Sequence, residues 1–354
     1  MVYVVIILFA TNTISGYLHT NYDVFVNIYI TMLIAPLIML MIVEVRRNIY
    51  YDKLSIYIIL FFVFVIISGV ILSSYNPAIF ILFALVLYTV AGSVWSKESD
   101  LIFNSFFEYL AVILITALLI LSLVTEYDRF SGFSVSATTL SIYLLIIYVV
   151  LVVDKPKIYA LLFGLPVVYL LLISQTRSAL VLFLVIVLLS MGYGERKHMK
   201  KLFIVTVLLL SFVYPIYGAL SALTDSGIML RDGDLQDGSF ITRYWLTMYI
   251  FEDYLQSNIF HILFGLGAEQ SRSLVMDYYG YDVHVHNDFL RLLYDFGVIG
   301  SMIYIFILYK IAIKNRLTYI LIIIYLFSFF HNMIYDVYQL CILLIFAQQR
   351  SRHW

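Results

Sequence analysis

The segment HVHNDFLRLLYDFGVIG, residues 284–300, joins the longest polar stretch of the chain to an apolar run. The polar stretch extends from about residue 224 to residue 290, and the rest of the chain is almost entirely apolar. A membrane protein with a chemical task needs a water-facing place for it, and no other stretch is long enough. We therefore expect this stretch to carry the function and to lead directly into a membrane-spanning helix.

The composition excludes a soluble domain. With 63% hydrophobic, 17% aromatic and 12% charged residues, a soluble fold would lack the polar surface to cover its apolar content. The net charge of -1 argues against a nucleic-acid partner. The single cysteine, Cys341, lies inside an apolar run, so a disulfide within the chain is excluded.

Apolar runs separated by short polar joints recur along the chain, and most approach the length of about 20 residues that crosses a bilayer. They predict an all-α, polytopic integral membrane protein with about 12 transmembrane helices and one large loop that contains short helices. The division is nine transmembrane helices in residues 1–222, the catalytic loop in 223–295 and three transmembrane helices in 296–354. The runs lie at about 2–18, 24–43, 54–72, 78–95, 102–124, 133–153, 158–174, 178–193, 202–222, 296–311, 317–333 and 336–347.

The basic residues predict the orientation. Alternate joints hold every lysine of the chain, so the positive-inside rule makes these joints and both termini cytoplasmic and turns the long loop outward. Met1 enters an apolar stretch without a basic n-region, which indicates a retained first span. The basic residues on the outward side are all arginine, whose planar guanidinium binds phosphate with two hydrogen bonds. The alternative interpretation is that the positive-inside rule has removed lysine from this side and that arginine remains by chance. These residues are Arg129, Arg177, Arg231, Arg243, Arg272 and Arg291.

Arg177 and Arg243 are candidate anion-binding residues. Arg177 lies at the outer end of two apolar runs, where an intramembrane arginine costs about 2.5–3.5 kcal/mol and normally has a partner or ligand; its alternative role is snorkelling to head groups. Arg243 lies near the start of a predicted amphipathic helix, residues 242–262, that would lie along the membrane. A helix N-terminus favours anions, although Arg243 could instead pair with Glu252 or Asp253.

Two features of that amphipathic helix follow from its sequence. Trp245, Tyr249 and Phe260 are expected to be its anchors at the membrane interface. The segment Phe264-Gly265-Leu266-Gly267 is expected to end it in a tight turn.

His284, His286, Asn287 and Asp288 form the densest polar cluster. Histidine takes a proton near neutral pH, which predicts a general base. A metal site is the second interpretation, but neighbours in the chain converge poorly on one ion, so we expect neither metal nor cofactor. A histidine that merely caps the next helix is the third. Asn287 or Asp288 is expected to be that helix's N-cap.

These residues resemble the signature of the O-antigen ligase and Wzy polymerase superfamily. That signature has a His-Asn pair, a leucine, an acidic residue and two glycines, the second entering a transmembrane helix. The pair Arg177-Ser178 is similar to an earlier element of the family, and Arg243 with Trp245 and a Gly-x-Gly is similar to its loop element. Asp295 is a departure, because the family more often has glutamate there. The matching residues are His286, Asn287, Leu290, Asp295, Gly297, Gly300, Gly265 and Gly267.

The resemblance implies a metal-independent glycosyltransferase of the GT-C type in the bacterial inner membrane, with its active site facing the periplasm. Its donor would be a glycan on undecaprenyl diphosphate. His286 would be the base for the acceptor hydroxyl, and Arg177 and Arg243 would grip the diphosphate. Supporting roles would fall to Asn287, His284, Asp295 and Arg291.

Polymerase and ligase share this machinery and differ in the acceptor, which is another lipid-linked repeat unit or lipid A–core. The small loop favours the polymerase, with the O-antigen ligase as the alternative. A lipid-linked oligosaccharide flippase is an alternative from another class. Expected partners are the undecaprenyl-diphosphate-linked donor and acceptor and the lipid bilayer, with a chain-length regulator protein as a candidate and no nucleic acid.

Overall fold

The structure is a computed structural model, and every regular element that it describes is a helix. It describes residues 57, 60–61, 63–64, 97–124, 129–132, 134, 136–153, 155–192, 196–211, 238–280, 287–313 and 316–331. The all-α prediction is confirmed for this part of the chain, in which no strand occurs.

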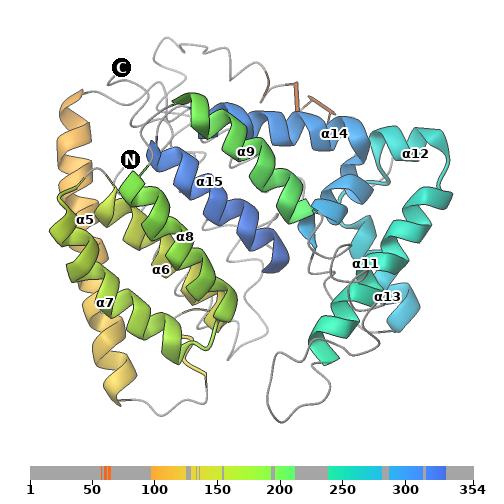
Figure 1. Cartoon of the computed structure of the whole chain (residues 1–354). Coiled ribbons are helices and arrows are strands. Elements are labelled where there is room, and N and C mark those ends of the chain that lie inside the picture. Colours follow the sequence, from red (N-terminus) through yellow and green to blue (C-terminus); the bar gives the residue numbers. More distant parts are fainter. Residues whose placement is uncertain are drawn as a thin grey trace.

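The described helices fall into two groups (Figure 1). On one side lie α5 (Lys97–Val124), α6 (Ala137–Val152), α7 (Lys157–Ile173) and α8 (Arg177–Gly192). On the other lie α11 (Gly238–Gln256), α12 (Ile259–Phe264) and α13 (Gln270–Tyr279). Between them run α9 (Arg196–Ser211), α14 (Asp288–Ala312) and α15 (Arg316–Ser328), and a short 3-10 turn, η1 (Phe329–His331), follows α15.

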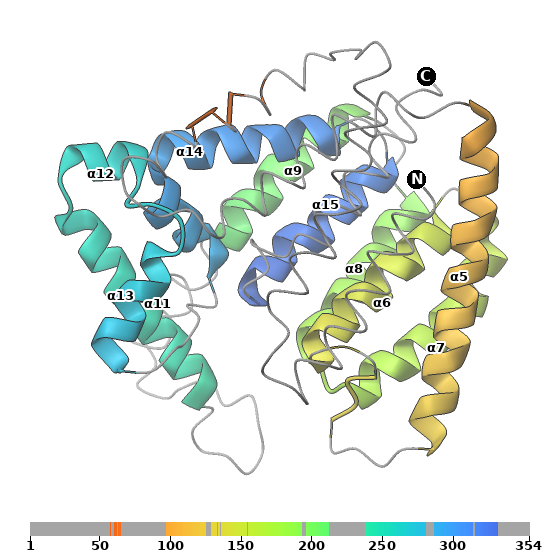
Figure 2. The same ribbon diagram turned by 180° about the vertical axis from the view of Figure 1, so that it is seen from behind.

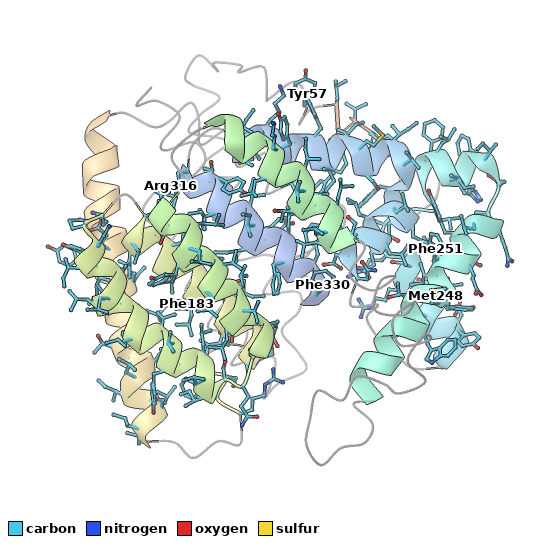
Figure 3. All side chains as sticks on the ribbon, viewed as in Figure 1. Tyr57, Phe183, Met248, Phe251, Arg316 and Phe330 are labelled. Atoms are coloured by element: carbon cyan, nitrogen blue, oxygen red, sulfur yellow. The ribbon has the colours of Figure 1, made fainter. Side chains whose placement is uncertain are left out.

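The main core is centred on α6 and α15, which pack against each other. Nearly every residue of both helices is buried, as expected for a helix that is apolar all round. Phe183 of α8 packs on Tyr148 of α6 with ring centroids 4.8 Å apart (Figure 3). These helices therefore form the inside of the bundle, and α5, α7, α8 and α9 form its outside.

The outer helices are apolar on their exposed faces as well. Leu123 of α5, Leu165 of α7 and Leu188 of α8 are 78%, 67% and 69% exposed, and each has exposed apolar neighbours on its own helix. Soluble monomers rarely expose contiguous apolar surfaces of this kind. A surrounding hydrocarbon phase accounts for apolar side chains on both the inside and the outside of the bundle.

The helix α14 connects the two groups, as the view from behind also shows (Figure 2). Within the described residues it alone is both long and apolar enough to cross a membrane, and six shorter apolar helices accompany it. The predicted runs 102–124, 133–153, 158–174, 178–193, 296–311 and 317–333 coincide with described helices. Most of the other runs lie outside the described residues, so the count of about 12 spans stays a prediction.

Candidate functional site

Helix α14 begins where the sequence predicts. The side chain of Asn287 accepts a hydrogen bond from the backbone N–H of Leu290, 3.3 Å away, so Asn287 is the N-cap. The helix then bends at Gly297, whose φ of 65° and ψ of -176° are not helical. The residues from Asp288 to the bend therefore form a short helical segment at the start of α14 that points in a different direction from the rest of the helix.

The turn after α12 sits in this bend. The N–H groups of Leu266 and Gly267 donate to the carbonyl oxygens of Tyr294 and Asp295, at 3.0 and 2.9 Å. A Cβ on Gly297 would lie 2.5 Å from the backbone nitrogen of Gly265, so only glycine permits this approach of two backbones. The predicted tight turn at the end of α12 is confirmed, and its partner is the glycine of the motif.

The second glycine of the motif has a packing role. A Cβ on Gly300 would lie 2.6 Å from the ring of Phe64, which belongs to an earlier segment of the chain. In the same region Tyr57 packs against Phe306, with ring centroids 4.9 Å apart (Figure 3). The motif's glycines thus let both the loop turn and an N-terminal segment approach α14 closely.

Asp295 is a helix cap. Its buried carboxylate accepts hydrogen bonds from the N–H groups of Glu269 and Ser271, at 3.1 and 2.9 Å. These groups belong to the N-terminus of α13, where a negative charge is stabilised by unpaired N–H groups and the helix dipole. A shorter side chain suits this contact because the two backbones are already adjacent. Asp295 therefore anchors the start of α13 to α14, and its predicted supporting role in the site stays a prediction.

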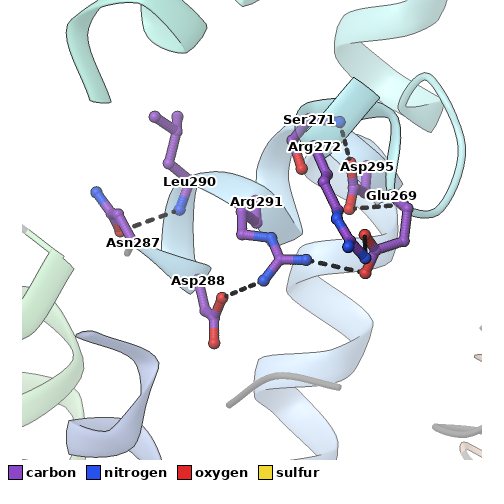
Figure 4. A network of polar contacts seen from close by, with 8 residues as sticks. All are labelled: Glu269, Ser271, Arg272, Asn287, Asp288, Leu290, Arg291 and Asp295. Carbon is purple, nitrogen blue, oxygen red and sulfur yellow. Dashed lines mark hydrogen bonds and ion pairs between the residues drawn. The ribbon is translucent and has the colours of Figure 1, made fainter. Parts of the chain in front are cut away.

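Arg291 is fully buried between two carboxylates (Figure 4). Its guanidinium donates to Asp288 and to Glu269, at 3.0 Å each. Arg272, which is 39% exposed, reaches Glu269 from the other side at 3.5 Å. Arg291 thus forms a buried ion-pair network that joins α14 to the start of α13, and its predicted supporting role in the site stays a prediction.

Replacing Arg291 should loosen the loop far more than replacing Arg272. In Arg291→Met, the fully buried carboxylate of Asp288 loses its ion pair, while the partly buried Glu269 keeps its pair with Arg272, and breaking a buried pair costs about 3–5 kcal/mol. In Arg272→Met, a half-exposed pair worth less than about 1 kcal/mol is lost. Thermal unfolding of the purified proteins in detergent measures the difference. Equal melting temperatures for the two variants would contradict the assignment of Arg291 as the residue that holds α14 and α13 together.

A small apolar core supports this network. It contains Leu246, Ile250 and Tyr254 of α11, Val275 of α13 and the adjoining face of α14. Polar contacts close its edges. The Tyr294 hydroxyl donates to Asp253 at 2.7 Å, and the Tyr254 hydroxyl donates to the Ile262 carbonyl oxygen at 2.8 Å. The three loop helices and the start of α14 are therefore one packed unit.

The predicted amphipathic helix is two helices. Asn258 interrupts it and caps α12, accepting a hydrogen bond from the N–H of His261 at 2.9 Å. Trp245 and Phe260 are 60% and 49% exposed, as interfacial anchors must be. Tyr249 instead packs on Tyr278, with ring centroids 4.2 Å apart. Partial desolvation, with the nearby Asp253 carboxylate, raises the pKa of Tyr249.

The structure corrects the position of Arg243. Because α11 begins at Gly238, Arg243 lies in the second turn, beyond the four unpaired N–H groups of a helix N-terminus. The argument from the helix dipole therefore does not apply to it. Arg177 is the first residue of α8. The side chains of both arginines, and His284 and His286 entirely, lie outside the described residues.

Glu269 is the site residue that sequence reasoning missed. It has a left-handed backbone, with φ of 65°, and no motif includes it. The spacing of Asp288 and Arg291, three residues apart on a helix, was a signal for their pairing. Nothing local indicates that Glu269 completes the set, because it is 22 residues away in the sequence.

The site is thus a capped helix start directly after the His-x-His segment, joined by hydrogen bonds and ion pairs to an aromatic-rich loop region beside an apolar bundle. The apolar outer surface of the bundle fits an integral membrane protein. Residues 158–305 match the family model Wzy_C, described as O-antigen ligase, which is consistent with the resemblance to the O-antigen ligase and Wzy polymerase superfamily. The match runs from α7 into the second half of α14. No curated protein matches the chain significantly.

Proposed function

We propose that the protein is a polysaccharide polymerase that extends a glycan on undecaprenyl diphosphate at the outer face of the inner membrane. The observation that carries this proposal is the family match over residues 158–305, a stretch that contains Arg177, Arg243 and His286 and the clamped start of α14. Proteins of this family are integral membrane proteins, which agrees with the apolar outer surface of the bundle.

In the proposed reaction the hydroxyl of the acceptor sugar attacks the anomeric carbon of the donor glycan. His286 takes the hydroxyl proton as the new C–O bond forms. The bond from the anomeric carbon to the diphosphate oxygen breaks, and undecaprenyl diphosphate leaves with its electron pair. No divalent metal is required, because Arg177 and Arg243 stabilise the charge that grows on the leaving group more than they stabilise the ground state.

The proposed topology has about 12 spans and cytoplasmic termini, with the loop domain of residues 223–295 outside. The boundary at residue 296 falls beside the bend at Gly297, where α14 changes direction. The packed unit of α11, α12 and α13 holds residues on both sides of the His-x-His segment in fixed positions. This rigidity supports the proposal, because a general base must stay within hydrogen-bond reach of the proton it removes.

The acceptor decides between polymerase and ligase. Cells that lack the protein should carry single repeat units on the core if it is a polymerase. They should lack glycan on the core and keep lipid-linked polymer if it is a ligase. If the protein is a flippase, cells that lack it should keep the lipid-linked repeat units on the cytoplasmic side of the membrane. The polymerase is favoured because the loop is compact: one small core and one ion-pair network account for its described part.

Arg177→Lys tests the grip on the diphosphate. Lysine keeps the charge but not the planar fork that binds two phosphate oxygens. We expect the variant to insert normally and to polymerise about tenfold more slowly, the effect of about one hydrogen bond to a charged group. Polymer length and rate in membranes measure this. Unimpaired polymer would show that Arg177 only anchors the helix at the head groups.

A further inference from the structure

Arg129 holds the joint from which α8 begins. It lies in the connection between α5 and α6, and its Nε donates to the carbonyl oxygen of Ser174 at 3.0 Å. Its Nη2 donates to the hydroxyl of Thr138 at 3.3 Å. The next residue, Phe130, donates its N–H to the carbonyl oxygen of Ile173 at 3.2 Å. The connection is therefore tied to the last residues of α7 by a side chain and by backbone.

The joint itself is only three residues long. Ser174, Gln175 and Thr176 separate α7 from α8, and Gln175 has a left-handed backbone with φ of 53°. From the inside, the Ser174 hydroxyl lies 2.9 Å from that of Ser141 on α6, and Thr176 is buried. Arg129 is the contact from the outside. Together these contacts fix the backbone position at which Arg177 begins α8.

The charge of Arg129 adds to this arrangement. Its side chain is exposed, and Nη1 makes no hydrogen bond within the described residues. By the positive-inside analysis it lies on the same side of the membrane as Arg177. It therefore brings a guanidinium to the end of the bundle where α8 starts, while one of its nitrogens bonds to the backbone of Ser174 and another bonds to the Thr138 hydroxyl.

We propose that Arg129 is a positioning residue of the donor diphosphate site: by holding the Ser174–Thr176 joint it sets the backbone position at which Arg177 begins α8. This inference rests on the proposed function, in which Arg177 grips the diphosphate. The physical reason is that catalysis depends on the precise placement of the groups that contact the substrate. A misplacement of about 1 Å in a group that contacts the reacting part of a substrate can cost about 100-fold in rate, and a joint of three residues has little slack to absorb a lost contact.

The test compares Arg129→Gln and Arg129→Lys with a matched control, Lys157→Gln. Lys157 is an exposed cation at the other end of α7. In purified protein, both Arg129 variants should lower kcat/KM for the lipid-linked donor about tenfold and leave the KM for the acceptor and the thermal unfolding temperature unchanged. Lysine should not rescue, because it lacks the fork that bonds two oxygens. Lys157→Gln should leave both constants unchanged.

The result distinguishes positioning from a general effect on folding. A merely structural role would lower the thermal unfolding temperature and would lower activity only in proportion to the folded protein lost, and that outcome would overturn the inference. On an Arg177→Lys background, Arg129→Gln should add less than about twofold, since residues that act through one another are not additive. Full additivity would also overturn it. If Arg177→Lys alone is fully active, the proposed donor site fails, whereas an impaired Arg177→Lys beside a normal Arg129→Gln rejects only the role of Arg129.

Discussion

His286→Ala is expected to abolish polymer while the protein accumulates in the membrane at its normal level. A positioned general base contributes about 10²–10⁴-fold in rate, so little polymer should remain over the time of cell growth. The side chain precedes a helix start that is held by a cap and two ion pairs on other residues, so its removal should not disturb the loop. Polysaccharide ladders on gels measure the effect.

The matched control is His261→Ala. His261 is another histidine of the same loop, on α12, and its ring lies 3.4 Å from the Asn258 amide. This substitution should give normal ladders. Normal ladders from His286→Ala, or the same loss from both histidines, would contradict the assignment of His286 as the base.

Gly297→Ala is expected to have the second large effect, on the docking of the loop. An added Cβ meets the backbone of Gly265 and Leu263 at 2.5 Å, and backbone cannot rotate away as a side chain can. Overpacking of this kind costs about 1–3 kcal/mol. The backbone of Gly297, with φ of 65° and ψ of -176°, lies in a region that essentially only glycine adopts, which adds about 1–3 kcal/mol for a residue with a Cβ. We expect a lower melting temperature in detergent, faster protease cleavage within the loop and loss of polymer.

Gly280→Ala separates the two contributions. Gly280 also has a positive φ, of 73°, but nothing lies within 4 Å of an added Cβ. It should therefore show only the backbone strain, about 1–2 kcal/mol, and keep most of its activity. Equal destabilisation by the two substitutions would show that the close approach of Gly265 and Gly297 contributes nothing to docking.

The elements that sequence predicts best are those with local causes. The apolar runs coincide with helices because an apolar segment must satisfy its backbone internally, whatever surrounds it. The N-cap at Asn287 is set by a hydrogen bond three residues away in the chain. The helix break at Asn258 also has a local cause, since an asparagine before an apolar run is a common helix start. The sequence nevertheless predicts one continuous helix here, because the apolar spacing continues across Asn258.

The parts that sequence reasoning missed are long-range. Asp295 caps α13 from a position 24 residues further along, and Glu269 pairs with Arg291 across 22 residues. The approach of Gly265 to Gly297 depends on the folded loop, although both glycines stood in the quoted pattern. Composition and spacing report which residues are unusual. They do not report which unusual residues meet.

The most direct test is a reaction of the purified protein in liposomes with lipid-linked repeat units, with and without a chelator. The account predicts polymer of increasing length, one undecaprenyl diphosphate released for each unit transferred, and no effect of the chelator. Transfer of repeat units across the bilayer without any new glycosidic bond or released lipid diphosphate would contradict it.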